Sequence, residues 1–423
     1  MTSIRQAPST EDGSPHASVQ RRTLGVLFAG AVFARGAISL SFAVAVLLIE
    51  DMLGSSRWAG MSTVAITVGT ALSAAMLSSF MDRRGRRPGL TLGYVLATAG
   101  GALALFSAEQ QYIVLFLIGM VLIGMGAGTS NLARYAAADL ATPETKAKAI
   151  SFIVFASTVG AVGGPILVGL ADDIGQDFGL RENVGPNALT GLFFGLAAIV
   201  MYVALRPDPL VLIDGLRKPS DDKKTGFVAT LRLLWSHPSA RVALLALVIA
   251  QAVMVGVMAM TPLHMRAHGH EVGMIGLVIS AHTAGMYAFA PLAGWAADRF
   301  GRVATISLGA AVLIVATALT ALAGEAPALL MFPGLYLLGL GWSFGMVAGS
   351  ALLTESVPAE ERVSAQGVAD LMAAIVSGVA ALASGLVLDM AGFHILSMIG
   401  ILASGIMLVV GFARGKQLSF AAG

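Results

Sequence analysis

The chain has 423 residues, of which 57% are hydrophobic and only 12% are charged, and its formal net charge is +2. This composition and the mean hydropathy of +0.82 exclude an ordinary soluble domain and predict an all-α polytopic membrane protein. The basic residues lie in short loops, so we expect no nucleic-acid binding. With no cysteine, the chain forms neither a disulfide nor a thiolate metal site, and we expect no cofactor and no metal.

The predicted elements begin with residues 1–22, a polar stretch typical of a disordered tail. The apolar run at 24–49 is too long for a secretion signal and contains Arg35, so it predicts a first transmembrane helix. Eleven further spans are predicted at 58–80, 88–107, 112–138, 149–171, 188–205, 241–262, 272–296, 304–323, 328–352, 363–390 and 393–412.

The spans divide into two groups of six. Residues 207–240 are rich in Pro, Asp, Lys and Ser and predict a cytoplasmic linker. The N-terminal bundle is then expected at 23–206, the C-terminal bundle at 241–413, and a short tail at 414–423.

Two charged stretches, at 78–90 and 294–306, interrupt the apolar runs. They align Asp82 with Asp298, Gly85 with Gly301 and Arg86 with Arg302, each pair 216 positions apart (298 − 82 = 216). An offset of about half the chain indicates two similar halves laid end to end, an arrangement common in secondary transporters.

These stretches resemble the loop signature between helices 2 and 3 of the major facilitator superfamily. The match covers Asp82, Arg83, Gly85 and Arg86 in the first copy, and Asp298, Arg299, Gly301 and Arg302 in the second. Ser78 stands where the first glycine of the signature usually lies, whereas Gly294 keeps that glycine. The resemblance implies twelve transmembrane helices in two pseudo-symmetric six-helix bundles, with helices 1, 4, 7 and 10 lining a central cavity.

The resemblance also implies a conformational latch at the cytoplasmic side. Asp139 would pair with Arg86, and Glu355, 216 positions after Asp139, would pair with Arg302. Alternatively, these charges only mark solvated loops and set the topology.

The predicted fifth helix carries Gly160, Gly164, Pro165 and Gly169. This pattern resembles the Gly-Pro signature of the drug:proton antiporter branch, although simple close packing of helices would also account for it. Many of those antiporters carry an arginine on helix 4 where this chain has Met120, so no proton relay is assigned there.

Orientation follows from the basic residues, which concentrate on the cytoplasmic side of membrane proteins. Of the 26 Lys and Arg residues, 21 fall in the tails and in loops on one side, whereas the other side has only Arg57, Arg181 and Arg266. We therefore expect both termini in the cytoplasm and the protein in the cell (inner) membrane.

Arg35 is the most informative polar residue, because an arginine at mid-membrane costs about 2.5–3.5 kcal/mol even on the lenient insertion scale. The offset of 216 places Gln251 opposite it (251 − 35 = 216). We interpret Arg35 as a group that recognises an anionic or acidic solute; alternatively it pairs with an acid or with carbonyl groups and ties helices together.

Other candidates serve binding or coupling. Asn131 and Arg134 lie on one face of helix 4, although snorkelling to the membrane surface also accounts for Arg134. Asp370 is the carboxylate expected inside the membrane. It is a candidate for the proton carrier and, alternatively, for a member of the latch. His282 titrates in a useful range but is equally a candidate structural residue. Phe42 and Trp342 would line the cavity.

We therefore predict proton-coupled export of a small organic compound by a monomer, through alternating access. The alternative is uptake or facilitated movement of a small organic anion with Arg35 as its counter-ion. A membrane enzyme would need a nucleophile and base at a convergent spacing, which the sequence does not supply; a sensor without transport is the remaining class. The expected partners are the solute, protons and the lipid bilayer.

Overall fold

The computed structural model describes residues 15–139, 146–214, 227–323, 327–358 and 361–422. Within these residues the chain folds into helices, as the composition predicts. They are α1 (Pro15–Leu53), η1 (Ser56–Trp58), α2 (Met61–Arg84), α3 (Arg86–Glu109), α4 (Ile113–Asp139), α5 (Lys146–Ile166), α6 (Val168–Asp177), α7 (Gly185–Ala204), α8 (Pro209–Asp214), α9 (Phe227–Ser236), α10 (Pro238–Ala267), α11 (Val272–Tyr287), α12 (Ala290–Phe300), α13 (Arg302–Ala321), α14 (Pro327–Glu355) and α15 (Arg362–Ala422).

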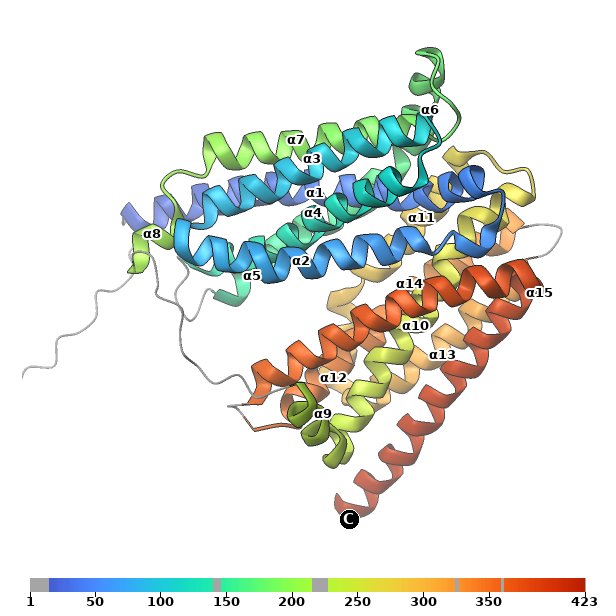
Figure 1. The fold of residues 1–423 in the computed structure, drawn as a ribbon. Helices are drawn as coiled ribbons and strands as arrows, with labels where there is room; N and C mark the ends of the chain where they lie inside the picture. Colours follow the sequence, from blue (N-terminus) through green and yellow to red (C-terminus); the bar gives the residue numbers. More distant parts are fainter. Residues whose placement is uncertain (1–14, 140–145, 215–226, 324–326, 359–360, 423) are drawn as a thin grey trace, which may run out of the picture.

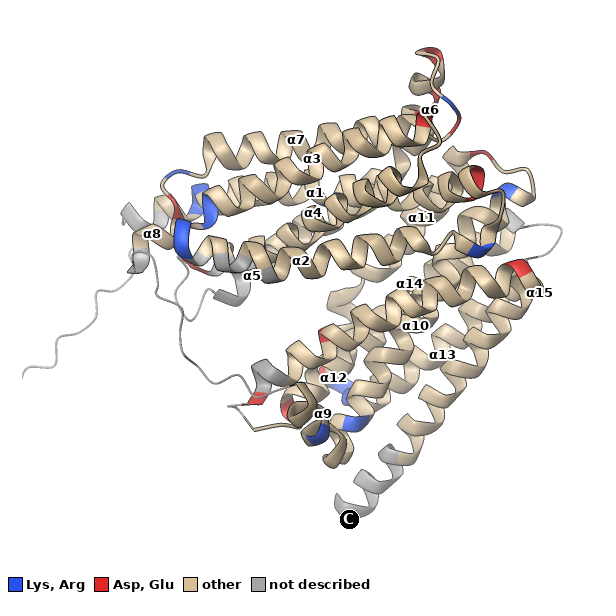
Figure 2. Cartoon of the chain, viewed as in Figure 1, with Lys and Arg blue, Asp and Glu red and all other residues tan. Residues whose placement is uncertain are grey.

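Nine helical segments of the described chain are long and apolar enough to cross a membrane, and α5 with α6 makes a tenth if the bent pair is one span. This confirms the all-α polytopic fold. The two last predicted spans both lie in α15, which turns at Gly392, where φ is 79°. The second predicted span corresponds to α2, which is not among the nine. Figure 2 shows that the charged residues lie near the two ends of the helices, with long uncharged stretches between them.

The helices form two groups, α1–α7 and α10–α15, which lie close together at one end and diverge toward the other (Figure 1). We call the diverging end, where α2 turns into α3, the motif end, and the converging end, where α1 turns into η1, the far end. The turns at the motif end fall at Gly85, with φ 99°, and at Gly301, with φ 91°. Only glycine adopts such values readily, which explains why both copies of the charged stretch contain it.

Two predicted segments have structure that the sequence did not predict. The fifth span, predicted over 149–171, breaks after Ile166 and resumes as α6 at an angle of 45°. Pro165 explains the break, because proline has no N–H for the helical ladder and its ring crowds the preceding turn. The segment predicted as a linker contains the helices α8 and α9; residues 215–226 lie outside the described chain.

Candidate solute-binding cavity

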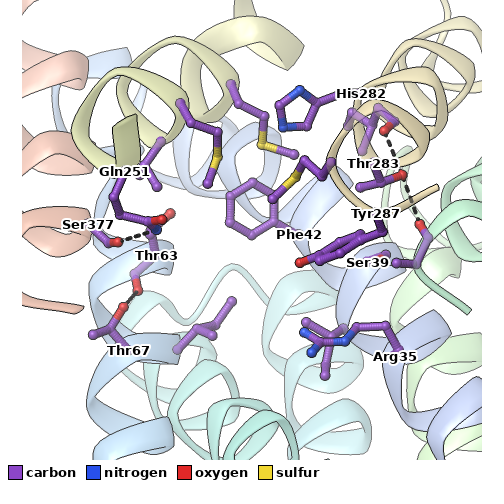
Figure 3. A pocket seen from close by; sticks show the side chains of 18 residues that line it. Arg35, Ser39, Phe42, Thr63, Thr67, Gln251, His282, Thr283, Tyr287 and Ser377 are labelled. Atoms are coloured by element: carbon purple, nitrogen blue, oxygen red, sulfur yellow. Dashed lines mark hydrogen bonds between the residues drawn. The ribbon is translucent and has the colours of Figure 1, made fainter. Parts of the chain in front are cut away.

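A cavity of about 240 Å³ lies between the two halves. Its walls come from α1, α2 and α5 of the first half and from α10, α11 and α15 of the second (Figure 3). Arg35, Phe42, Gln251 and His282, four residues predicted as site residues, line it. They come from three predicted helices, with Arg35 and Phe42 on the first, and the fold brings them to one space.

Arg35 projects from α1 into this cavity (Figure 3). Within the described chain its guanidinium makes no hydrogen bond and no ion pair, and its Nε atom is buried without a partner. A buried donor left unbonded costs about 1–3 kcal/mol, and more when it is charged. The alternative interpretation, in which Arg35 ties helices together, therefore has no contact to support it among the described residues.

Gln251 lies on α10 in a different environment. Its amide nitrogen donates to the hydroxyl of Ser377 at 2.8 Å, and its amide oxygen accepts from the indole nitrogen of Trp342 at 2.8 Å. Both ends of the amide are held, so the orientation of the side chain is fixed by α14 and α15. Trp342 does not line the cavity itself but supports its wall, packing edge-to-face with Tyr287 at 6.0 Å between ring centroids.

His282 is fully buried on α11, yet it belongs to the cavity wall. Its Nδ1 lies 2.9 Å from the backbone oxygen of Leu335. Because a carbonyl oxygen only accepts hydrogen bonds, Nδ1 carries the ring proton and Nε2 of the neutral ring keeps a free lone pair. Nε2 has no partner within the described chain.

Hydroxyl groups surround these residues, and the sequence analysis missed them. They are Ser39, Thr63, Thr67, Thr283 and Ser377. Thr67, Thr283 and Ser377 all donate to backbone carbonyls one turn earlier in their own helices. The Thr63 hydroxyl, 6% exposed as a residue, is instead buried without a partner. Serine and threonine are common in helices, so no sequence pattern set these residues apart.

The remaining wall is soft and apolar. Phe42 and Tyr287 contribute rings, and Met254, Met258 and Met286 contribute thioethers (Figure 3). Methionine side chains are flexible and fill irregular gaps, so this wall can adapt to solutes of different outline.

The other predicted site residues lie elsewhere. Asn131 on α4 is half-buried and does not line the cavity, and the side chain of Arg134 lies outside the described part. Asp370 on α15 is exposed and also lies outside the cavity wall. The described residues contain no cluster of three His, Asp or Glu side chains placed to hold a metal ion.

The glycines of the fifth helix set the position of α1 beside Arg35. A Cβ atom at Gly160 would overlap the backbone oxygen of Val32, and one at Gly164 would lie 2.5 Å from the oxygen of Gly36. Close approach of α5 to α1 therefore requires glycine at both positions. Pro165 and Gly169 face the second half, as the next contacts show.

The far end is closed by two matched seams between the halves. In one, a Cβ at Gly60 would overlap the backbone oxygen of Ala381; in the other, a Cβ at Gly276 would overlap that of Pro165. The two contacts are equivalent, since 276 − 60 and 381 − 165 both equal 216. Gly169 meets Gly273 in the second seam. Each seam thus brings backbone against backbone.

Ion pairs bridge the halves at the same end. Arg266 of α10 binds Glu50 and, at 2.8 Å, Asp51, both on α1. Arg57 of η1 lies 3.3 Å from Asp389 of α15. Glu50 and Arg266 are themselves 216 positions apart. They therefore hold equivalent positions in the two halves, carry opposite charges and bind each other.

At the motif end the arginines of the charged stretches pair within their own halves. Arg86 donates from Nε to Asp139 at 2.8 Å and from Nη2 at 3.3 Å. Arg302 donates to Glu355 from Nε at 3.1 Å and from Nη2 at 3.0 Å, and also binds Asp298. These are the pairings that the resemblance implies. Arg83 is exposed, Arg299 is exposed, and the side chain of Asp82 lies outside the described part.

One buried acid escaped the sequence analysis. Asp172 on α6 is 2% exposed; it accepts a hydrogen bond from the backbone of Asn183 at 2.6 Å and another from Gln176 at 2.8 Å. These bonds tie the loop after α6 back onto the helix. The sequence analysis missed this acid because it ended the fifth span at 171, one residue before it.

Comparison with known proteins agrees with the geometry. The sequence profile of the Major Facilitator Superfamily matches residues 27–273 and 258–417. The chain is 34% identical over 403 residues to YdeG, an uncharacterized MFS-type transporter of Bacillus subtilis, covering 94% of this chain and 93% of that protein. It is 31% identical over 306 residues to the riboflavin transporter RfnT of Brucella anthropi, covering 72% of this chain and 73% of RfnT.

Among solved structures, the fold is similar to that of a bacterial homologue of the human lysosomal transporter Spinster in an inward-facing, unoccupied conformation. The TM-score is 0.70 at 16% sequence identity, over 95% of this chain and 96% of that one.

Proposed function

The chain belongs to the Major Facilitator Superfamily and is therefore a transporter rather than an enzyme, and we propose that it exports a small organic solute in exchange for protons by alternating access. The observation that carries the proposal is Arg35, a cation without a partner in a cavity between two halves that meet at one end only. An unpaired arginine in a largely apolar wall attracts an acidic or strongly hydrogen-bonding group.

The two halves are open at the motif end. The bias of basic residues predicts that the motif end faces the cytoplasm. The halves diverge at that end and are joined at the far end by the glycine seams and by the ion pairs of Arg57 and Arg266. In this conformation the cavity is reached from the cytoplasm, which is the state in which an exporter collects its solute and an importer releases it. The Gly-Pro pattern of α5, with its resemblance to drug:proton antiporters, is what favours export.

Proton coupling needs a titratable group that the solute or the conformation can influence. His282 lies in the cavity wall with a free lone pair at Nε2, whereas Asp370 is exposed outside that wall. We therefore favour His282 as the proton carrier and keep Asp370, near the start of α15, as a candidate for the latch.

The latch is part of the proposal. Arg86 with Asp139 and Arg302 with Glu355 hold the turns of their own halves in this conformation. We propose that these pairs rearrange when the motif end closes, so that the charged stretches influence the equilibrium between the two states.

A second candidate is uptake of an organic anion, which the same unpaired Arg35 also favours. RfnT, a relative over most of the chain, is named as a riboflavin transporter, and riboflavin is a planar compound rich in hydrogen-bonding groups. Riboflavin is therefore a reasonable first test compound for either direction.

Proteoliposomes that contain the purified full-length chain distinguish the two functions. An exchanger accumulates labelled solute when the lumen is acidic, and protons leave the lumen in exchange. A symporter accumulates solute when the outside is acidic. The test uses riboflavin and a panel of aromatic acids, with a pH-sensitive dye in the lumen. Accumulation only with an acidic exterior replaces export by uptake; no movement under either gradient contradicts the proposal.

A further inference from the structure

Three polar atoms in the cavity wall have no hydrogen-bond partner: Nε of Arg35, Oγ1 of Thr63 and Nε2 of His282. They come from three different helices, α1, α2 and α11. A buried polar group left unbonded costs about 1–3 kcal/mol, and buried polar groups in native proteins are nearly always bonded. Neighbouring side chains of the same wall, such as Thr283 and Ser377, follow that rule. The three exceptions share one cavity, where a bound solute has access to groups that the protein itself does not pair.

Their chemical characters differ. The guanidinium of Arg35 only donates hydrogen bonds. Nε2 of His282 only accepts in the neutral ring, because Nδ1 is committed to the oxygen of Leu335 at 2.9 Å. The hydroxyl of Thr63 can do either. A solute that satisfies all three must present an acceptor or an anion to Arg35 and a donor to His282.

The positions of these atoms fix the order of groups along the solute. In Figure 3, Arg35 and His282 lie at opposite ends of the labelled side chains, and Thr63 lies to one side. The rings of Phe42 and Tyr287 lie between the two ends in the same view. The part of the solute between the acidic end and the donating end is therefore apolar, and a flat aromatic body suits it.

Access to His282 depends on the soft wall. The residue is 0% exposed, while Met254, Met258 and Met286 are each 6–7% exposed and line the same cavity. Because methionine has three rotatable bonds and adapts to its surroundings, a solute of the right length can turn a thioether aside and reach Nε2.

We propose that the transported solute is an amphipathic aromatic acid whose acidic group binds Arg35 and whose opposite end donates an N–H or O–H to Nε2 of His282, with Thr63 as a third contact. The inference rests on the proposed function and deepens it by naming the class of solute. It makes Thr63 and His282 specificity-determining residues, in addition to any part His282 has in coupling.

Three simple compounds test the proposal: p-coumarate, which has both ends; cinnamate, which lacks the donor; and methyl p-coumarate, which lacks the charge. Binding to the purified full-length chain is measured by calorimetry. We expect the wild type to bind p-coumarate about three- to tenfold more tightly than cinnamate, the effect of one hydrogen bond. We expect a larger preference, about ten- to hundredfold, for p-coumarate over its ester.

Variants assign each preference to one residue. His282→Phe should abolish the preference for p-coumarate over cinnamate, because it removes the acceptor for the hydroxyl group, and Arg35→Gln should abolish the preference for the acid over the ester. Thr63→Val, which keeps the shape, should weaken p-coumarate binding about two- to fivefold. His264→Phe is the matched control, because this histidine stacks on Phe393 and lies outside the cavity wall. His282→Leu replaces His282→Phe if the larger ring prevents folding.

The proposal is overturned if p-coumarate does not bind, if the wild type binds p-coumarate and cinnamate equally, or if both His282 variants keep the preference. These outcomes differ from a failure of the proposed function. Gradient-driven transport by the wild type without any preference for the hydroxyl group overturns only the inference. An intact preference without transport in proteoliposomes overturns only the function.

Discussion

At the scale of single residues, the proposed function depends on Arg35, because nothing among the described side chains neutralises it. Placing this charge at mid-membrane is expensive, and a protein gains nothing in stability from it. The expense is explained if a solute supplies the missing negative group in each cycle.

We predict that Arg35→Gln weakens the affinity for an acidic solute about ten- to hundredfold, the value of a charge-assisted hydrogen bond. Arg35→Lys should weaken it less, because it keeps the charge and loses only the bidentate geometry. Binding isotherms of the purified variants provide the measurement. Equal affinity of Arg35→Gln and wild type for acidic solutes would show that the charge has a purely structural role.

Coupling gives a second prediction at this scale. His282→Gln should stop accumulation driven by a pH gradient and preserve exchange of solute between equal pools at saturating solute, because it removes the titratable ring from the cavity wall. Asp370→Asn should keep gradient-driven accumulation. Both fluxes are measured on the same proteoliposome preparations. If Asp370→Asn stops gradient-driven accumulation and His282→Gln keeps it, Asp370 is the proton carrier. Loss of both fluxes in His282→Gln would indicate a structural role for the ring.

Some of these residues were accessible from the sequence and others were not. The offset of 216 predicted that Arg35 and Gln251 face a common space, and a charge or amide in an apolar run is conspicuous. Thr63 was not predictable, because its functional mark is the absence of a hydrogen bond that every other helical threonine around it makes. That absence depends on tertiary packing. Glu50 and Arg266 were accessible through the same offset (266 − 50 = 216) and were overlooked.

At the scale of helices, the two seams determine whether the far end can close. Gly60 and Gly276 hold equivalent positions, and each meets a backbone oxygen of the opposite half. A single methyl group at either position overlaps that oxygen. The seams therefore work only with glycine, and they open when the halves separate at this end.

We predict that Gly60→Ala and Gly276→Ala shift the protein toward the state open at the far end. Gly163→Ala and Gly256→Ala are matched controls, because a Cβ at either of those glycines has nothing within 4 Å. Because the chain has no cysteine of its own, spin labels on two introduced cysteines, one on η1 and one at the start of α11, report the distance across this end. If the spin-label distance also lengthens in the control variants, the opening results from the higher helix propensity of alanine and not from the seams.

The same scale shows why the helix boundaries were only partly predictable. The predicted span at 149–171 assumed that Pro165 is tolerated as a kink, but α6 continues to Asp177 at a new angle. The turns at Gly85 and Gly301 depend only on the local backbone, because glycine readily adopts their positive φ values. The angle after Pro165 depends on where α11 lies, and therefore on contacts distant in sequence.

At the scale of the whole molecule, the ion pairs at the far end hold the two halves in the conformation described here. Arg266 with Glu50 and Asp51, and Arg57 with Asp389, are all partly exposed. Such pairs contribute little individually, about 0.2–1 kcal/mol, which suits a closure that must reopen in every cycle.

We predict that Arg266→Glu opens the far end in part of the population, and that adding Glu50→Arg restores closure incompletely. The exchange works because the two positions are equivalent, and it is incomplete because Asp51 stays beside the new acidic side chain. The spin-label distance across the far end and the transport rate are the two measurements. Arg181→Glu, a reversal of another basic residue that the charge bias places in an outer loop, is the control. No rescue in the double variant would mean that Arg266 acts through contacts other than this pair.

The unpaired charge of Arg35 has an electrical consequence. Among the residues that line the cavity, Arg35 alone bears a permanent charge. The cavity of the empty transporter therefore carries one positive charge through the conformational change. When a monoanion is bound, the cavity carries no net charge. A full elementary charge in a transmembrane field is worth about 2.3 kcal/mol per 100 mV. A membrane potential that is negative inside would therefore hold the empty protein with its cavity toward the cytoplasm, and would speed the return of the empty exporter from the outward-facing state. Voltage would act on the empty protein, and loading with solute would release it from the field.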